Sequence, residues 1–406
     1  MELVPIFKRV IGLDVHQAQI TACALIEAPD GTVTVERRQF GAFKRDRRAL
    51  ALWCQSLNPD EVVMESTGIY WKSPYAALEK VGIRARVVNA RFIKQVPGRK
   101  TDIGDAEWLA ILGRAGLLRG SFVPPIQLRE LRLVARQRQK LAGQLAAEKN
   151  RLGKILADAG IRLSVVVSDL NGQSARAMIT ALIEGASSQE AVRFASKRLR
   201  ASPEQIEQAL DGEMTAAHRF VAGEVLAHIV ELEGRMARFE TYLIEGLKPQ
   251  HNILVLLQTI PGIDLIGAAM LLVEIGADMS VFGTADRIAS WVGLCPGNNE
   301  SAGKRKSGHM RKGNAYVRRL MCEFAHAASK TKCGFREKFR SLVVRRGKQR
   351  SIIALAHKML RTIFCMLRDA APYRDSAVDY EALAVKRNAP RWIKTLRRHG
   401  FLPATA

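Results

Sequence analysis

Residues 9–118 alternate between short apolar runs and amphipathic segments, which restricts this part of the chain to a layered α/β fold. RVIGLDV, ITACALIEA and GTVTVERRQF predict three strands, with the turn PDG joining the last two in a hairpin. A helix over residues 44–57 is expected next, followed by the strand EVVMES, the helix YAALEKVG, the strand IRARVVNA and the helix DIGDAEWLAILGRAGLL. The expected order is therefore β-β-β-α-β-α-β-α.

Four acids lie at matching points of this order. Asp14 ends the first strand and Glu65 ends the fourth, while Asp102 and Asp105 share one face at the start of the last helix. In a fold of the ribonuclease H type with this order, strands one and four are neighbours, so all four carboxylates would meet. Carboxylates at such close quarters require cations, and hard oxygen ligands suit Mg²⁺ or Mn²⁺, a pair of which can clamp a phosphodiester for in-line displacement.

Each of these acids also has an ordinary structural explanation. An acid at a strand end is commonly a turn residue, and Asp102 suits the N-cap of its helix. His16, on the same strand face as Asp14, is expected to be an ordinary partner and not a metal ligand. Four acids at matching points of one topology are much less expected by chance, so the pattern favours the metal site.

The formal charge of +24 and the pI of about 10.2 indicate a polyanionic partner, nucleic acid before an anionic membrane surface. No apolar run reaches the length needed to span a bilayer, and no signal peptide is expected because Asp14 interrupts the early apolar run. The six cysteines form no C-x-x-C pair, which argues against zinc and disulfides and fits a reducing cytoplasm. The basic excess peaks over residues 301–350, which hold 16 lysines and arginines and only two acids.

The middle of the chain reads as helical. Residues 128–156 are highly charged, residues 160–220 predict several short helices, and a near-heptad seam follows at Val225, Ile229, Leu232, Met236, Phe239, Leu243 and Leu247. The charged neighbours of this seam favour an antiparallel hairpin or a coiled-coil dimer over burial in a globule. In LLQTIPGIDLIGAAMLLVEIG a Pro-Gly turn between two helices resembles a helix-hairpin-helix, whose second helix could offer free N–H groups to a phosphate.

The stretch GLCPGNNESAGKRKSGHMRKGN, residues 293–314, places a small hydroxyl, Ser301, among five lysines and arginines. Its sequence neither alternates like a strand nor repeats like a helix, so we expect an irregular basic loop. Gly303, Gly308 and Gly313 would let its backbone approach DNA closely. A solvated basic loop without function is the simpler alternative.

The motifs GLDV, MESTGIYW, KTDIGDAEWLA, IPGI and WVGLCPGNNESAGKRKSGHMRKGN occur in that order within residues 9–345. With them the chain resembles the DEDD-type transposases of insertion sequences, the bridge-RNA-guided recombinases. The resemblance implies a RuvC-like domain of the ribonuclease H type with its metal site at Asp14, Glu65, Asp102 and Asp105, a helical coiled-coil linker, and a mainly α transposase domain. The corresponding ranges here would be 1–124, 125–250 and 251–350, with a basic helical extension over 351–406.

The resemblance further implies a nucleophilic serine. Ser301 is the choice by its position between GLCP and KGN, although the family often has a Ser-Ser-Gly cluster where this chain has Glu-Ser-Ala-Gly; Ser307 is the alternative. A serine hydroxyl needs activation by a base or metal before it attacks phosphorus. Nearby cations would offset the charge that then develops, and the expected nucleic-acid contacts are Lys304, Arg305, Lys306, Arg311 and Lys312.

The hypothesis is therefore a transposase that cuts and rejoins donor and target DNA through a covalent phosphoserine with Mg²⁺ or Mn²⁺. The family implies guidance by a non-coding bridge RNA and a homo-oligomer, a dimer or tetramer, in which the acids of one subunit face the serine of another. Such a protein would be bacterial or archaeal, cytoplasmic and nucleoid-associated, without a membrane partner. One alternative is a RuvC-like structure-selective endonuclease that uses metal-activated water; another is a non-catalytic nucleic-acid-binding protein with a decayed metal site, against which the four acids argue.

Overall fold

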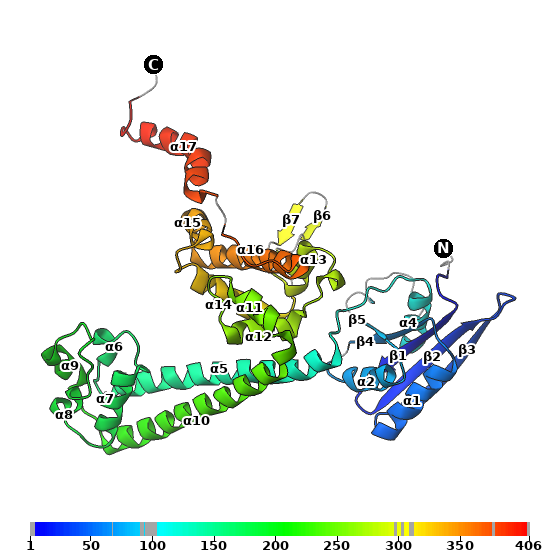
Figure 1. Ribbon diagram of the computed structural model, residues 1–406, viewed down its shortest axis with the longest axis horizontal. Coiled ribbons are helices and arrows are strands. Elements are labelled where there is room, and N and C mark those ends of the chain that lie inside the picture. The colour runs from blue at the N-terminus through cyan, green and yellow to red at the C-terminus, as the bar shows by residue number, and fades with distance from the viewer. Residues whose placement is uncertain are drawn as a thin grey trace. The chain divides into compact units, whose positions relative to one another are not determined.

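The structure is a computed structural model that describes residues 5–66, 68–89, 93, 104–295, 299–301, 304–307, 312–375 and 378–403. The chain divides into two compact units, Met1–Val123 and Pro124–Ala406. In Figure 1 the first unit runs from blue to cyan and the second from cyan to red. Among the described residues no helix is long and apolar enough to cross a membrane.

The first unit is built on one mixed sheet. Its elements are β1 (Arg9–Val15), β2 (Gln19–Glu27), β3 (Val33–Gly41), α1 (Lys44–Ser56), β4 (Glu61–Glu65), α2 (Lys72–Lys80), β5 (Arg86–Val88) and α4 (Asp105–Arg114). The predicted alternation of strands and helices is confirmed. β1, β2 and β3 pair antiparallel, β4 and β5 run parallel to β1, and the sheet order is β3-β2-β1-β4-β5. The first and fourth strands are thus neighbours, as expected.

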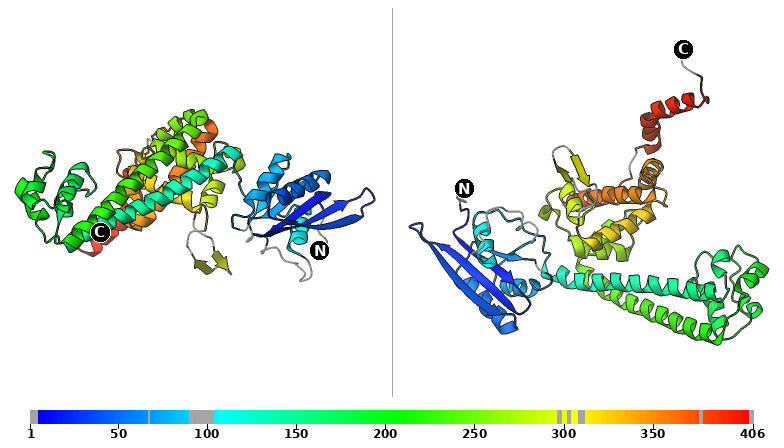
Figure 2. Two further views of the ribbon diagram at one scale, coloured as in Figure 1. Left: turned by 90° about the horizontal axis from the view of Figure 1, so that it is seen from below. Right: turned by 180° about the vertical axis from the view of Figure 1, so that it is seen from behind.

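The two faces of this sheet carry separate apolar layers, because alternate residues of a strand point to opposite sides. Leu13 and Met64 belong to the layer that α1 and α2 cover, whereas Val10 and Val63 belong to the layer that α4 covers. Figure 2 shows these helices on opposite sides of the sheet.

All six cysteines are free, and burial raises the pKa of the Cys54 thiol to about 12.

The second unit is almost entirely helical. Its elements are α5 (Ile126–Asp158), α6 (Leu163–Val166), α7 (Gln173–Ile183), α8 (Ser188–Val192), α9 (Pro203–Leu210), α10 (Ala216–Gly246), η1 (Lys248–Gln250), α11 (His251–Gln258), α12 (Leu265–Ile275), η2 (Met279–Val281), α13 (Ala285–Val292), β6 (Asn299–Ser301), β7 (Lys304–Ser307), α14 (Ala315–Ala328), α15 (Gly334–Arg346), α16 (Lys348–Asp369) and α17 (Tyr380–Arg398). The short helices expected between residues 160 and 220 are α6 to α9. Ser187, Ser202 and Thr215 start α8, α9 and α10 with capping boxes, which satisfy backbone N–H groups at these helix ends.

The heptad seam of α10 packs against α5 of the same chain. Val225, Ile229 and Leu232 are buried in one cluster with Leu141 and Leu145 of α5. Figures 1 and 2 show the two long helices side by side and antiparallel, with α6 to α9 at one end. Of the two expected arrangements, the structure has the antiparallel hairpin, so this seam is already covered without a second copy.

The Pro-Gly turn between α11 and α12 packs against α14. Gly262 has a φ of +90°, and a β-carbon there would lie 2.7 Å from the backbone nitrogen of Ala328, so only glycine fits. Asp264 caps α12 by accepting a hydrogen bond from the Gly267 N–H at 2.7 Å. At least one of the donors expected to be free for phosphate is therefore bound by a carboxylate of the chain itself.

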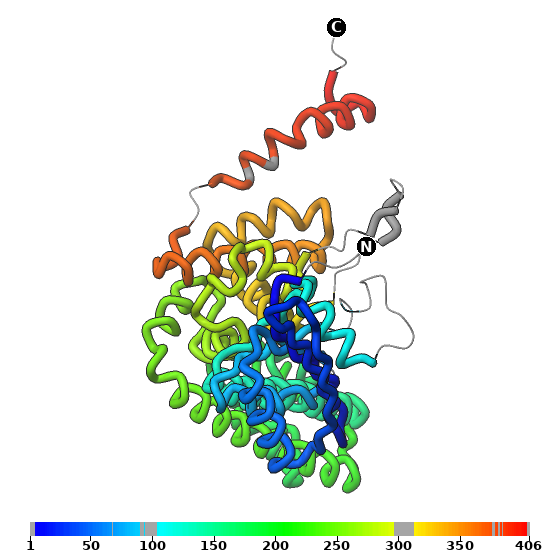
Figure 3. Tube along the Cα trace, turned by 90° about the vertical axis from the view of Figure 1, so that its right-hand side faces the viewer, coloured from blue at the N-terminus to red at the C-terminus, as the bar shows by residue number. Residues whose placement is uncertain are grey.

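Helices α13, α14 and α15 pack on α16, and α17 contacts α15. The ring of Tyr380 at the start of α17 lies beneath two ammonium groups, with Lys358 Nζ at 4.4 Å and Lys338 Nζ at 4.9 Å from its centroid. Figure 3 shows α17 projecting from the rest of this unit. Of the basic extension expected over residues 351–406, residues 351–369 thus belong to α16 and pack with α13, α14 and α15, and α17 follows them in contact with α15.

Candidate active site

The sheet register places Asp14 and Glu65 next to each other. Leu13 of β1 pairs with Met64 of β4 in parallel register, so the residues that follow them lie side by side at the same edge of the sheet. Strand alternation puts both carboxylates on the face of Val10 and Val63, which α4 covers. Both acids are partly buried. Two of the four predicted acids are therefore neighbours at the ends of adjacent strands.

Asp105 reaches the same end of this face from the helix above it. It is the first residue of α4, and the next residue, Ala106, packs so tightly on Gly12 of β1 that no β-carbon fits between them. Gly12 precedes Asp14 by two residues on the same strand face. A carboxylate in the first turn of α4 also interacts favourably with the helix dipole, which is the structural explanation for Asp105.

Among the residues that the structure describes, the carboxylate of Asp14 pairs with His16, whose Nε2 lies 3.0 Å from Asp14 Oδ2. This agrees with the expectation of a partner. Among the described residues no three His, Cys, Asp or Glu side chains are grouped so that they could hold a metal ion. Asp102 lies outside the described residues. Asp14, Glu65 and Asp105 supply only hard oxygen donors, the type that Mg²⁺ and Mn²⁺ prefer, but a complete ligand set would have to include Asp102.

The segment that contains Ser301 forms two short antiparallel strands, so the expectation of an irregular loop was wrong. Ser301 ends β6 and pairs with Lys304, the first residue of β7, while Glu300 pairs with Arg305. Backbone hydrogen bonds define this ribbon, and its polar residues carry none of the apolar alternation that would have indicated it. For Ser301, Lys304, Arg305, Lys306 and Ser307 the structure describes the backbone alone, and Arg311 lies outside the described residues.

The end of this segment is fixed against its beginning. A β-carbon on Gly313 would lie 2.4 Å from the carbonyl carbon of Val292 and 2.5 Å from the nitrogen of Gly293. The N–H of Asn314 donates to the carbonyl of Trp291 at 3.1 Å. Gly313 was expected to let DNA approach; it instead lets the protein backbone approach itself. Lys312, just before it, is exposed.

Most of the positive charge of residues 301–350 is not neutralised by acids of the same stretch. Its two acids, Glu323 and Glu337, are paired with Arg319 and Arg336 respectively. Four exposed cations at the junction of α15 and α16 have no ion-pair partner among the described residues, namely Arg345, Arg346, Lys348 and Arg350. Burial is the main cause that lowers the pKa of Lys338, with repulsion from Lys358 and Arg346 adding to it. Such a surface fits a polyanion.

Two family models match the chain. A model for the DEDD transposases of IS110, described as "Transposase", matches residues 11–160, and a model described as "Transposase IS116/IS110/IS902 family" matches residues 254–340. Together the two matches cover more than half of the 406 residues. The first match includes Asp14, Glu65 and Asp105, and the second includes Ser301.

Three relatives match as well. A "probable family 20 transposase" of Pseudomonas aeruginosa is 26% identical over 329 residues, which are 79% of this chain and 87% of the relative. The insertion element IS900 uncharacterized 42 kDa protein of Mycobacterium paratuberculosis is 30% identical over 170 residues, 39% of this chain and 42% of the relative. The insertion element IS110 uncharacterized 43.6 kDa protein of Streptomyces coelicolor is 32% identical over 139 residues, 32% of each chain.

Proposed function

The chain belongs to the transposase family of IS116, IS110 and IS902, and from this premise we propose that it cuts and rejoins DNA through a covalent phosphoserine at Ser301. A transposase is a DNA-cleaving and recombining enzyme. The observation that supports metal-dependent DNA cleavage is the adjacency of Asp14 and Glu65 at the ends of neighbouring parallel strands, with α4, which begins at Asp105, covering the same face. The role of Ser301 is proposed from the family resemblance. This strand order, β3-β2-β1-β4-β5, supports a ribonuclease H-like, RuvC-like fold for the first unit.

The family suggests dependence on a divalent metal, and we assign its ligands to Asp14, Glu65, Asp102 and Asp105. Mg²⁺ is the cation that this all-carboxylate set fits best, with Mn²⁺ as a substitute. When bound, such an ion would neutralise phosphate oxygens and favour in-line displacement. Apolar residues of β1, β4 and α4 pack in one cluster. This packing fixes the backbone positions of Asp14, Glu65 and Asp105.

The reaction proceeds by attack of the Ser301 hydroxyl oxygen on a phosphorus of the DNA backbone. The serine hydroxyl gives up its proton as its oxygen bonds to phosphorus, the bond from phosphorus to one sugar oxygen breaks, and that sugar oxygen takes up a proton, so that no proton is gained or lost overall. Rejoining reverses the roles, since a strand-end hydroxyl attacks the phosphoserine and the serine leaves. The charge that develops on the phosphoryl oxygens is offset by three cations of β7, the strand that pairs with the strand of Ser301. These are Lys304, Arg305 and Lys306.

Guidance by a bridge RNA, the choice of donor and target DNA by base pairing, and assembly into a dimer or tetramer are proposed from the family alone. The unneutralised positive charge over residues 312–350 is compatible with two nucleic-acid partners. Because α5 of the same chain covers the seam of α10, an interface between copies would use other surfaces.

The four acids are tested by isosteric substitution. Asp14→Asn, Glu65→Gln, Asp102→Asn and Asp105→Asn should each lower strand cleavage by at least about 100-fold, because each removes ligand charge, while DNA affinity stays within about twofold. Mg²⁺ or Mn²⁺ should support cleavage by the parent protein, and Ca²⁺ should support it poorly. Asp30→Asn, in the exposed turn between β2 and β3, is the matched control and should be fully active. Full recombination by the Asp14→Asn protein would refute the metal site.

A further inference from the structure

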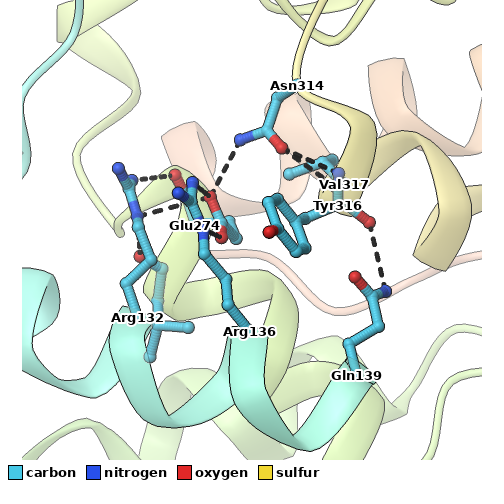
Figure 4. A network of polar contacts seen from close by, with 8 residues as sticks. Arg132, Arg136, Gln139, Glu274, Asn314, Tyr316 and Val317 are labelled. Carbon is cyan, nitrogen blue, oxygen red and sulfur yellow. Dashed lines mark hydrogen bonds and ion pairs between the residues drawn. The ribbon is translucent and has the colours of Figure 1, made fainter. Parts of the chain in front are cut away.

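A buried carboxylate ties the end of the Ser301 segment to the long helix α5 (Figure 4). Glu274 of α12 is only 1% exposed. Its oxygens accept hydrogen bonds from Arg136 Nε at 2.7 Å and Arg136 Nη2 at 3.0 Å, and Arg132 Nε lies 3.3 Å away. Asn314 Nδ2 donates to Glu274 Oε2 at 2.8 Å. One carboxylate thus joins α5, α12 and the residue that follows the segment.

The partners on α5 lie on one face of that helix. Arg132, Arg136 and Gln139 are spaced four and three residues apart, the spacing of neighbours on a helix surface. Arg132 also donates to the carbonyl of Glu274 at 2.6 Å, the guanidinium of Arg136 lies 4.4 Å from the ring centroid of Tyr316, and Gln139 Nε2 donates to the carbonyl of Tyr316 at 3.5 Å. α5 therefore contacts both Glu274 and the first turn of α14.

Asn314 also caps the N-terminus of α14. Its Oδ1 accepts hydrogen bonds from the N–H groups of Tyr316 at 3.0 Å and Val317 at 3.2 Å, which caps α14. Its neighbour Gly313 is pressed against Val292. The end of the Ser301 segment is thus held toward α13 through Gly313 and toward α5 through Asn314 and Glu274.

A cluster of this kind determines geometry more than stability. Burying one carboxylate with two guanidinium groups carries a desolvation cost that can exceed their mutual attraction, and well-packed apolar residues of similar volume often serve stability as well. Burial lowers the pKa of Arg132 to about 10, so this guanidinium group stays charged at neutral pH although burial disfavours its charged form. What apolar residues could not supply is a directional link between Glu274 and Asn314.

We infer that Glu274, together with Arg132, Arg136 and Asn314, is a positioning cluster that orients the Ser301 segment for attack on phosphorus. The inference rests on the proposed role of Ser301. None of the four residues touches the reacting atoms in this account; they act by holding Gly313 and Asn314, which follow the Ser301 segment in the chain. A displacement of about 1 Å at a reacting group can cost about 100-fold in rate, so a loosened link should reduce catalysis without reducing DNA binding.

The test removes the hydrogen bond that Asn314 donates to Glu274. Asn314→Asp keeps the cap of α14 but sets two carboxylates against each other, so the rate of covalent protein–DNA adduct formation at saturating DNA should fall about 100-fold with an unchanged Kd. A purely structural role would lower the fraction of folded protein and would not lower the rate at saturating DNA with an unchanged Kd.

Ser202→Ala is the control for a lost helix cap, because Ser202 caps α9, one of the short helices at the end of the α5–α10 hairpin, and its adduct rate should match the parent's. If Asn314→Asp does not fold, Asn314→Ser keeps a cap without reaching Glu274 and should show the same kinetic loss. A folded Asn314→Asp or Asn314→Ser protein with the parent rate would overturn the positioning role. An adduct that survives Ser301→Ala would instead overturn the proposed function of Ser301.

Discussion

A β-carbon on Gly12 of β1 would lie 2.0 Å from the carbonyl oxygen of Ala106 in α4. Gly12→Ala must therefore push the start of α4 away from the sheet, and Asp105 with it. We expect a loss of about 1–3 kcal/mol in the free energy of unfolding, or more, and a fall in strand cleavage that exceeds the loss of folded protein. Urea denaturation and cleavage assays on the same preparation check both.

Gly234→Ala is the matched control for that substitution. Gly234 lies inside α10, where the nearest atom to a new β-carbon is Arg238 Nη1 at 4.0 Å. Alanine there should stabilise the helix by up to about 1 kcal/mol and leave cleavage unchanged. If Gly12→Ala behaves like this control, α4 does not set the position of Asp105 as described.

The basic residues around Ser301 should contribute to affinity by releasing counterions from nucleic acid. Lys304→Gln, Arg305→Gln, Arg311→Gln and Lys312→Gln should each reduce the slope of log affinity against log salt by about one where a phosphate contact is lost. Lys197→Gln, at an exposed cation between α8 and α9, should leave the slope unchanged. Four unchanged slopes around Ser301 would identify the segment as a solvated surface.

The helices at the end of the α5–α10 hairpin should loosen in acid. Glu233 of α10 accepts hydrogen bonds from Arg176 of α7 at 2.6 and 2.7 Å and pairs with Lys149 of α5, and Arg176 chiefly lowers the pKa of Glu233 to about 2. Because the folded pKa is depressed, the stabilisation is complete above the ordinary value of 4.5 and is lost as the pH falls toward 2.

Hydrogen exchange of the α7 amides, corrected for the intrinsic effect of pH, measures this loss. Protection of α7 should fall between pH 4.5 and 2 in the parent protein. In Glu233→Gln the protection should already be lower at pH 6, by about 1 kcal/mol because the pair is partly exposed, and should change less over the same pH range. An identical pH profile for both proteins would show that this ion pair does not stabilise α7.

If the acids and the serine of different subunits form one site, two inactive proteins should complement each other. Asp14→Asn and Ser301→Ala proteins, each inactive alone, should recover part of the cleavage activity when co-expressed, since a mixed dimer holds one intact centre. The phosphoserine should form on the subunit whose acid is mutated. Demonstrably mixed oligomers without cleavage would mean that the acids and Ser301 work within one chain.

The sequence predicted what depends on local periodicity and on a known strand order. Alternating apolar runs indicated the five strands of the first unit, and the position of Asp14 and Glu65 at strand ends implied their adjacency once β1 and β4 were taken as neighbours. The heptad spacing of α10 indicated a covered helix face. It did not identify α5 as the partner, because either arrangement buries the same apolar seam.

What the sequence did not predict depends on contacts between distant residues. β6 and β7 are polar throughout, so their pairing has no apolar signal. Gly313 was expected to allow a close approach of DNA. Its actual contact, with Val292, joins the two ends of a long segment, and no local pattern in the sequence indicates such a contact. Glu274 was overlooked, although a single acid within the apolar run LLVEIG is a signal of a buried partner; its partners Arg132 and Asn314 lie far away in sequence.

The central claim, cleavage through a phosphoserine at Ser301, is tested most directly by denaturing the protein after reaction with labelled DNA and locating any covalent adduct by mass spectrometry. We expect the adduct on the peptide that contains Ser301, its loss in Ser301→Ala, and its retention in Ser307→Ala. DNA that is cleaved by the parent protein without any covalent attachment would contradict the account and indicate hydrolysis by water.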